Sequence, residues 1–414
     1  MRRAAFLILA ILPLTSQSSD WPQLLGPTRD GVYAGIDLAD SWPDSGPPVV
    51  WRREVGQGFS GPAVAAGKLI LFHRLGDKET VECLDAMAGK RLWRFEYPTA
   101  YHDDFGFDEG PRATPAIADG RVYTYGAEGV LNCLDLATGT NLWRVDAMAQ
   151  LQAGKGFFGT ACSPLVEGSA VLLIVGGHGG AGIVALDQTT GKLRWKATSD
   201  EASYSSPVAA TIAGRRYAFF FTRDALVGAN PEDGRVFFHF PFRPPIRNSV
   251  SAATPLIVGD LLFLSASYGA GAVLLRIKEG GPEKIWESKT ALSSHYATSV
   301  YRDGFLYGID GRTDPGFQPP ASLRCVELAT GKVRWQQDAF GAAIITLAGD
   351  QLLILTEKGD LIRAPASPET FKPSLRARIL TGEVRAHPAL ADGLFYARSK
   401  NSLVCVDLRK PKHD

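Results

Sequence analysis

The sequence has almost no net charge and lacks a long apolar run. Its 44 Lys and Arg residues balance 43 Asp and Glu residues, which gives a formal charge of +1. This balance argues against a general electrostatic attraction to nucleic acid or to an anionic membrane surface. The apolar run from Ala4 to Leu14 is far shorter than the roughly 20 residues that cross a bilayer. We therefore expect no nucleic-acid partner and no membrane span.

The sequence also lacks the short motifs of several enzyme classes. It contains no H-E-x-x-H, no C-x-x-C and no G-x-S-x-G, so metalloprotease, thiol-redox and serine-hydrolase functions have no motif support. A C-x-x-C-H haem attachment site is absent as well. Helical periodicity of useful length is missing beyond the first residues, which predicts an all-β chain.

The first residues have the features of a secretory signal. Residues 1–18 combine a basic start, a short apolar run and small residues suited to cleavage near Ser18. No Cys follows the run before Cys83, so a lipid-anchored start is not expected. We predict a cleaved signal peptide, a soluble periplasmic or secreted protein, and a single domain over residues 19–414.

Five cysteines in an exported protein would ordinarily suggest disulfides. Four of them, however, occupy one repeated position two residues before an acidic residue: Cys83, Cys133, Cys325 and Cys405. Equivalent positions on packed sheets lie about 10 Å apart, beyond the roughly 7 Å Cα limit for a bridge. The fifth, Cys162, has no evident partner, so all five are predicted to be free.

A pattern with a period near fifty residues returns along the chain and is clearest at residues 131–144, LNCLDLATGTNLWR. An acidic residue stands four positions before a Gly, and a Trp stands four positions after it. Alternating apolar residues predict a strand, the acidic residue and Gly predict a turn, and the Trp lies on a second strand. The repeat residues are Trp51, Asp85, Gly89, Trp93, Asp135, Gly139, Trp143, Asp187, Gly191, Trp195, Trp286, Glu327, Gly331 and Trp335.

This pattern resembles the pyrroloquinoline-quinone-type (PQQ-like) β-propeller repeats, whose signature is roughly A-x-D-x-x-T-G-x-x-x-W. The resemblance covers nearly the whole chain after the signal, and WPQLLGPTRDG near the start is similar to secreted bacterial members. It implies a β-propeller, in which each aromatic packs against a neighbouring copy.

The repeat count predicts eight four-stranded antiparallel blades. Seven outer strands carry an aromatic, with Phe238 in the place of one Trp, and an eighth falls near residues 376–380. Residues 386–408 supply only three strands, and the strand around Trp51 has no partners of its own. We expect these amino- and carboxyl-terminal strands to pair and close the ring.

Polar loop residues from several blades are predicted to gather on one rim, where fourth-to-first and second-to-third strand loops meet. The candidate ligand or partner site comprises His102, Asp103, Asp104, Asp108, Glu109, Arg112, His178, Arg247, Asn248, His295, Tyr296, Asp310, Arg312 and Asp314. The carboxylates between positions 103 and 109 could offer oxygen ligands to Ca²⁺, although they lack the spacing of a known calcium loop. No metal site is assigned.

The segment Gly177 to Gly182 matches G-x-G-x-x-G but is followed by another repeat hairpin. A dinucleotide site would need a helix there, so the segment is interpreted as a loop with His178 at its tip.

Three functions remain open. The first is a non-catalytic exported scaffold that binds a protein or peptide on a loop face, as a monomer and without a cofactor. The second, which the resemblance implies, is a quinoprotein dehydrogenase using PQQ and calcium. It is opposed by the absence of an adjacent Cys pair and of a haem site. The third is a propeller that binds a glycan or small molecule. The scaffold is favoured, and no catalytic residue is assigned.

Overall fold

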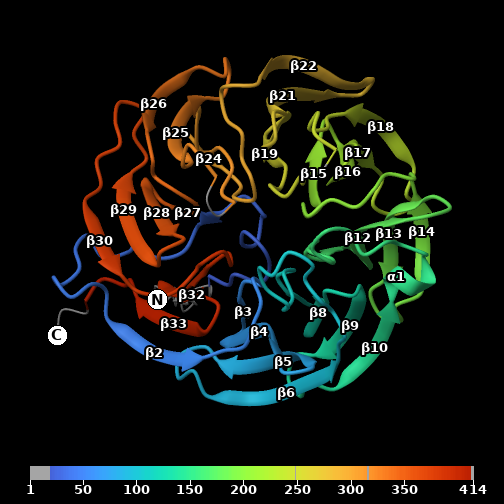
Figure 1. Cartoon of the computed structure of the whole chain (residues 1–414), viewed down its shortest axis with the longest axis horizontal. Coiled ribbons are helices and arrows are strands. Elements are labelled where there is room, and N and C mark those ends of the chain that lie inside the picture. The colour runs from blue at the N-terminus through green and yellow to red at the C-terminus, as the bar shows by residue number, and fades with distance from the viewer. Residues whose placement is uncertain (1–18, 248, 315–316, 412–414) are drawn as a thin grey trace, which may run out of the picture.

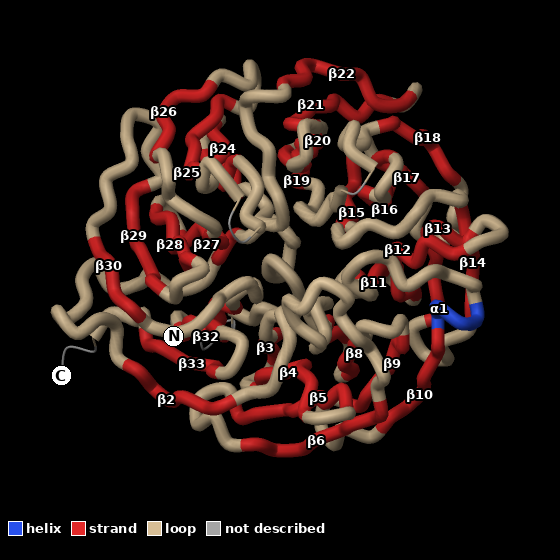
Figure 2. The backbone as a smooth tube through the Cα atoms, in the orientation of Figure 1, coloured by secondary structure: helices blue, strands red, loops and turns tan. Residues whose placement is uncertain are grey.

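A computed structural model describes residues 19–247, 249–314 and 317–411. The predicted signal peptide, residues 1–18, lies outside the described residues. Eight sheets are arranged around a central axis as an eight-bladed β-propeller, which confirms the predicted fold (Figure 1). The helix α1 (Ala147–Gln150) has four residues, and nothing helical in the described ranges has the length and hydropathy of a membrane span (Figure 2).

Within each blade the strands run antiparallel from the inner to the outer edge of the ring. Blade 1 contains β3 (Ala63–Ala65), β4 (Lys68–Leu75), β5 (Lys78–Asp85) and β6 (Arg91–Pro98). Blade 2 contains β7 (Ala116–Ala118), β8 (Arg121–Tyr125), β9 (Val130–Asp135) and β10 (Asn141–Asp146). Blade 3 contains β11 (Leu165–Glu167), β12 (Ala170–Gly177), β13 (Ala181–Asp187) and β14 (Leu193–Ala197). Blade 4 contains β15 (Val208–Ile212), β16 (Arg215–Phe221), β17 (Ala225–Ala229) and β18 (Val236–Pro241).

The second half of the ring repeats the arrangement. Blade 5 contains β19 (Leu256–Val258), β20 (Leu261–Ala266), β21 (Gly271–Lys278) and β22 (Gly281–Ser288). Blade 6 contains β23 (Val300–Arg302), β24 (Phe305–Asp310), β25 (Ser322–Glu327) and β26 (Val333–Gln337). Blade 7 contains β27 (Ala343–Ala348), β28 (Gln351–Thr356), β29 (Asp360–Pro365) and β30 (Leu375–Arg378). Blade 8 contains β31 (Ala389–Ala391), β32 (Leu394–Arg398), β33 (Ser402–Asp407) and β2 (Val49–Glu54).

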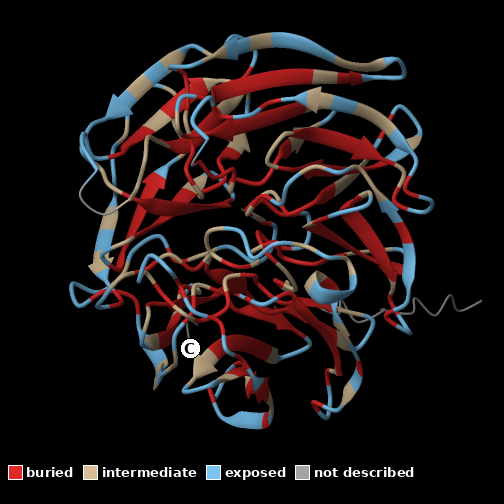
Figure 3. Cartoon of the chain, turned by 45° about the vertical axis from the view of Figure 1, so that its right-hand side comes forward, coloured by how far each residue is buried: buried red, intermediate tan, exposed pale blue. Residues whose placement is uncertain are grey.

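Blade 8 closes the ring by pairing the two ends of the chain, as predicted. The outer strand β2 pairs antiparallel with β33, and Trp51 lies opposite Cys405. In Figure 1 the blue β2 lies beside the red β33. Figure 3 shows that the inner strands are buried while the outer strands expose one face.

In six of the eight blades the repeated Trp joins the blade to the next one. Trp143 donates from its indole nitrogen to the carbonyl of Gln188 at 3.2 Å, in the turn of blade 3. A Cβ on Gly191 of that turn would meet the Trp143 ring at 2.7 Å, so this position requires Gly. Gly191 also has φ +70°, a conformation that Gly adopts without steric cost. Trp51, Trp93, Trp195, Trp286 and Trp335 donate to the carbonyls of Ala86, Leu136, Pro231, Leu328 and Ser367.

The cysteine prediction is also confirmed, since all five cysteines are free and buried. Cys83, Cys133 and Cys325 lie directly opposite Trp93, Trp143 and Trp335 on the neighbouring strand of the same blade. In these three blades the position thus places a small side chain opposite the large aromatic.

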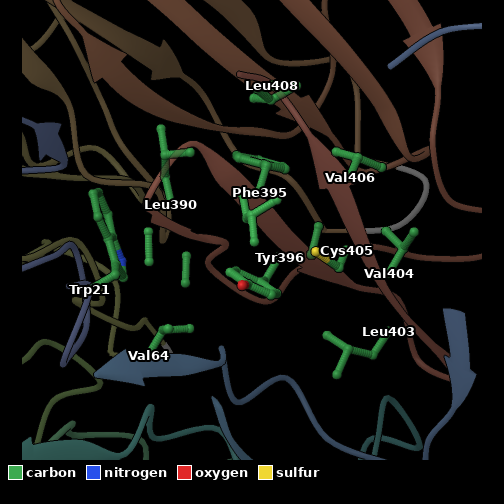
Figure 4. Close-up of a cluster of buried hydrophobic side chains, with 14 of the residues drawn as sticks. Trp21, Val64, Leu390, Phe395, Tyr396, Leu403, Val404, Cys405, Val406 and Leu408 are labelled. Atoms are coloured by element: carbon green, nitrogen blue, oxygen red, sulfur yellow. The ribbon is translucent and has the colours of Figure 1, made fainter. Parts of the chain in front are cut away.

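The path of residues 19–48, here called the crossing segment, was not predicted. Near its start Trp21 is 2% exposed and exchanges backbone hydrogen bonds with Val64 at 2.8 Å. Figure 4 shows Trp21 in the same apolar cluster as Val64 and Leu390. The segment then forms β1 (Val32–Tyr33), which adds a fifth, parallel strand to the inner edge of blade 7. Blade 7 therefore exceeds the predicted four strands, because the edge of β27 is free to pair.

Candidate functional site

Loops from all blades form one face of the ring, here called the loop face, where fourth strands connect to the next first strands. Beneath it lies a central cavity of about 160 Å³. Two positions recur in its wall, four and two residues before the start of an inner strand. The first position supplies Phe59, Arg112, Ala161, Tyr204, Ala252, Tyr296 and Arg385, and the second supplies Thr114, Ser163, Ser206, Thr254 and His387.

The crossing segment supplies Leu24 to the lining of the cavity and Arg29 to the inner strands around it. The Arg29 side chain is buried and donates to the carbonyl oxygens of Pro164 and Pro207, the second at 2.8 Å. Burial lowers the pKa of Arg29 to about 10, because the charged form loses its hydration. Residues from the start of the chain thus bind blades 3 and 4.

Aromatic rings and guanidinium groups alternate at the cavity. The Arg112 guanidinium lies 5.8 Å from the Phe59 ring centre and 5.5 Å from that of Phe158. The Arg385 guanidinium lies 5.7 Å from Phe59 and 5.5 Å from Phe107. Cation–π contacts of this kind hold the cations over apolar surface.

Asp103 organises the longest charged loop of the loop face. Its carboxylate accepts N–H bonds from Phe105, Phe107 and Asp108 at 2.9 to 3.1 Å, and Arg112 lies 3.2 Å away. Burial alone would raise the pKa of Asp103, but these N–H groups and the Arg112 charge outweigh it, so the pKa lies below its usual range. This predicted partner-binding residue therefore holds the loop in shape.

We expect Asp103→Asn to destabilise the protein by about 1 to 3 kcal/mol, because an amide has only one acceptor oxygen for these donors and no negative charge to pair with Arg112. Since the folded pKa is lowered, the stabilisation is present above the unfolded pKa of about 3.9 and is lost as the pH falls through the folded value. Urea unfolding at neutral and acidic pH measures both effects. Asp104→Asn is the matched control, because its side chain is 61% exposed, and equal effects of the two variants would contradict this role.

The other carboxylates of this loop do not converge on one point. Glu109 bonds His102 at 2.6 Å, Asp104 bonds Lys155 at 2.9 Å, and Asp108 accepts the N–H of Gly110 at 2.7 Å. Across the described ranges, no three His, Cys, Asp or Glu side chains are grouped so that they could hold a metal ion. The loop therefore has the geometry of a folded, internally paired turn.

His295 and Arg312 form a second polar group on the loop face. His295 is bonded to Thr313 at 2.7 Å and to Tyr268 at 3.0 Å, and it lines the cavity. Burial lowers its pKa to about 4, so the ring is neutral at pH 7. Arg312 stacks over Tyr268 at 4.4 Å and pairs with Asp314.

The remaining predicted residues are scattered. Asp310 accepts the N–H of Ser293 at 2.7 Å and pairs with Arg324 at 3.0 Å, away from the cavity lining. His178 is exposed in the loop between β12 and β13, as predicted, and no helix follows it. Arg247 lines a separate shallow pocket with Arg223 and Phe157, and Asn248 lies outside the described residues.

Sequence reasoning missed Arg385, Tyr204 and Phe59 as site residues. A signal for Arg385 was present, because R-A-H-P at residues 385–388 matches R-A-T-P at residues 112–115. Aligning the residues that precede each inner strand would have identified the recurring cavity position.

A family of known proteins matches this chain. Residues 77–337, more than half of the chain, match the family described as outer membrane protein assembly factor BamB, which is of the PQQ-like type. The chain belongs to this family. Solved structures agree with the PQQ-like propeller fold. BamB from Moraxella catarrhalis aligns with TM-score 0.65 at 17% identity, over 89% of this chain and 99% of that one.

Relatives of this PQQ-like propeller include both assembly factors and dehydrogenases. BamB of Bordetella pertussis is 24% identical over 72% of this chain and 74% of its own length. The quinone-type alcohol dehydrogenase subunit of Gluconacetobacter polyoxogenes is 24% identical over 59% of this chain. The match covers 35% of that subunit and 55% of the BamB of Burkholderia pseudomallei. The chain thus spans about a third and about half of these two relatives.

Proposed function

We propose that this protein is an exported, non-catalytic scaffold that binds a protein or peptide partner through its loop face. The observation that carries the proposal is a set of exposed apolar side chains among cations on that face. Phe105 is 54% exposed, Ile246 is 49% exposed and Phe317 is 38% exposed. They belong to loops of three different blades. A partner that contacts all three must therefore extend across the loop face. Exposed aromatics rimmed by Arg are typical of protein-binding surfaces.

The relatives named assembly factors support a protein partner, and the signal-like residues 1–18 support export. Ile246 and Phe317 lie beside cations, whereas Phe105 packs against Phe157 and Phe158. Arg312 lies 4.4 Å from the Phe317 ring centre, and Arg243 and Arg247 share a pocket with Ile246. This composition favours a partner segment that carries apolar and acidic side chains. We propose that the protein acts as a monomer, since one ring presents the complete face.

The dehydrogenase relatives raise the alternative of a quinone at the ring centre, but the residues present fit PQQ and calcium poorly. PQQ has three fused rings and three carboxylates, whereas the cavity of about 160 Å³ resembles in size one that accommodates benzene. Asp314 is the one carboxylate in the described lining, and Arg312 already pairs with it at 2.7 Å.

Site-specific photo-crosslinking tests the scaffold. A photoreactive residue at Phe105, Ile246 or Phe317 in the full-length exported protein is expected to give the same protein adduct at all three positions in intact cells. The control position is Met87, which is 49% exposed in the turn between β5 and β6 on the opposite face. Mass spectrometry of the adducts identifies the partner. Adducts at Met87 and none at the three loop-face positions would show that binding occurs elsewhere.

A further inference from the structure

The central cavity is lined by both apolar and cationic side chains. Leu24, Phe158 and Val250 contribute to its apolar lining, while Arg112 and Arg385 contribute guanidinium groups. At about 160 Å³ it is comparable to an engineered 150 Å³ cavity that binds benzene. A single small ring with a negatively charged substituent matches both the size of the cavity and its mixture of apolar and cationic side chains.

Arg385 is the cation with free hydrogen-bonding capacity. Its Nε donates to Glu383 at 2.6 Å, whereas its two terminal nitrogens make no hydrogen bond to any residue that the structure describes. The side chain is only 14% exposed, and its guanidinium is held near the faces of Phe59 and Phe107. Lys400 also pairs with Glu383, at 2.9 Å, so two cations share one carboxylate. A guanidinium with a free edge is suited to a carboxylate.

Arg112, in the equivalent position of blade 2, is already engaged. Its Nη2 donates to Asp103 at 3.2 Å and to the carbonyl of Asp108 at 3.0 Å. Its Nη1 has longer contacts with Tyr101 and Gly110. The same sequence position thus supplies a structural Arg in one blade and an available Arg in another.

Two further polar atoms at the cavity lack partners within the described part of the chain. The hydroxyl of Tyr296 makes no hydrogen bond there, although the residue lines the cavity. Nδ1 of His387 is buried and unpaired. Burial lowers the pKa of His387 to about 4, so the ring is neutral at pH 7. The Tyr296 hydroxyl and the His387 ring thus add polar groups to the cavity beside Arg385.

We propose that the central cavity binds a small aromatic carboxylate. The carboxylate accepts hydrogen bonds from the terminal nitrogens of Arg385 and from the Tyr296 hydroxyl, and the ring contacts Phe158 and Val250. The site adjoins the outer surface of the loop face, because the Phe105 ring centre lies 5.1 Å from that of Phe158, which lines the cavity. An aromatic ring with a nearby carboxylate is found both in a free aromatic acid and in the carboxyl-terminal aromatic residue of a bound chain.

Calorimetric titration with phenylacetate tests the site in the full-length protein. Arg385→Gln is expected to weaken phenylacetate binding by at least about tenfold, because it removes a charge-assisted hydrogen bond. Arg334→Gln is the matched control, since Arg334 is exposed on the outer strand β26. Acetate and benzyl alcohol, which lack the ring or the charge, are expected to bind much more weakly. Equal affinity of Arg385→Gln and the parent protein, or of benzyl alcohol and phenylacetate, would overturn the proposal.

Tyr296→Phe provides a second test if Arg385→Gln does not fold. Loss of one hydrogen bond is expected to weaken phenylacetate binding by about threefold to tenfold, with an unchanged melting temperature.

PQQ, with and without Ca²⁺, is the large competitor, and Ca²⁺-dependent binding tighter than that of phenylacetate would overturn the small-ligand assignment. A short peptide ending in Phe, compared with its amide, identifies the source. Tighter binding of the free peptide acid than of phenylacetate indicates a chain terminus, and weaker binding indicates a free acid. These titrations use no protein partner, so their outcome is independent of the crosslinking result.

Discussion

Removal of residues 386–414 is expected to abolish cooperative folding of the whole propeller. The deletion takes away β31, β32 and β33, which leaves β2 without its partner in blade 8. It also exposes the apolar cluster in which Trp21, Val64 and Leu390 pack, so blades 1 and 7 lose a neighbour. An opened ring has two unpaired sheet faces where the closed ring has none.

Circular dichroism on heating and size-exclusion chromatography measure the effect of the deletion. We expect no single sharp thermal transition and a shift toward aggregated or expanded species. A truncated protein that keeps the parent melting temperature and elution volume would show that β2 and β33 do not hold the ring closed.

Trp143→Ala is expected to lower the free energy of unfolding by about 3 to 5 kcal/mol. Trp143 is 8% exposed, and its ring packs on Gly191 while its indole N–H bonds the carbonyl of Gln188 in the next blade. The substitution therefore opens a cavity between blades 2 and 3 and removes a hydrogen bond. Denaturant unfolding gives the value.

Leu142→Ala is the control for this loss, because Leu142 precedes Trp143 on the same strand and is 47% exposed. Its effect is expected to stay within about 0.5 kcal/mol. Gly191→Ala should also destabilise the parent, but less so in the Trp143→Ala background, where the ring that its Cβ would meet is gone. A loss below about 1 kcal/mol for Trp143→Ala would mean that this Trp does not join the blades.

Much of the fold could be predicted because the residues within each repeat specify its strands and turns locally. In the copy that ends at Trp143, the Asp135 carboxylate accepts the N–H of Thr138 at 2.8 Å, and Gly139 has φ +76°. The turn is therefore specified within a few residues. Since the copies recur in register, the sequence also predicts which Trp meets which turn and how the ends pair.

The candidate site was harder to predict because its members are far apart in the chain. Asp103 and Asp108 resemble binding residues by type, yet both fold inward to hold their own loop. Whether a carboxylate points outward depends on which backbone N–H groups it can reach. This orientation cannot be predicted from the residue types alone. Arg385 could have been found only by aligning the residues before each inner strand, which matches R-A-H-P at 385–388 with R-A-T-P at 112–115.

The amino-acid sequence by itself determined the all-β class, the eight blades, the free cysteines and the closure of the ring, because short-range turn and strand patterns carry that information. Which residues line the central cavity was decided by the tertiary structure alone. Ring closure places blades 8 and 2 on either side of blade 1, so Arg385 and Arg112 both reach Phe59. The crossing segment has no repeat pattern, so its path also depends on the closed ring. Leu24 lines the cavity, and Arg29 donates to a backbone carbonyl of the inner strands, and both contacts exist only when the blades are assembled.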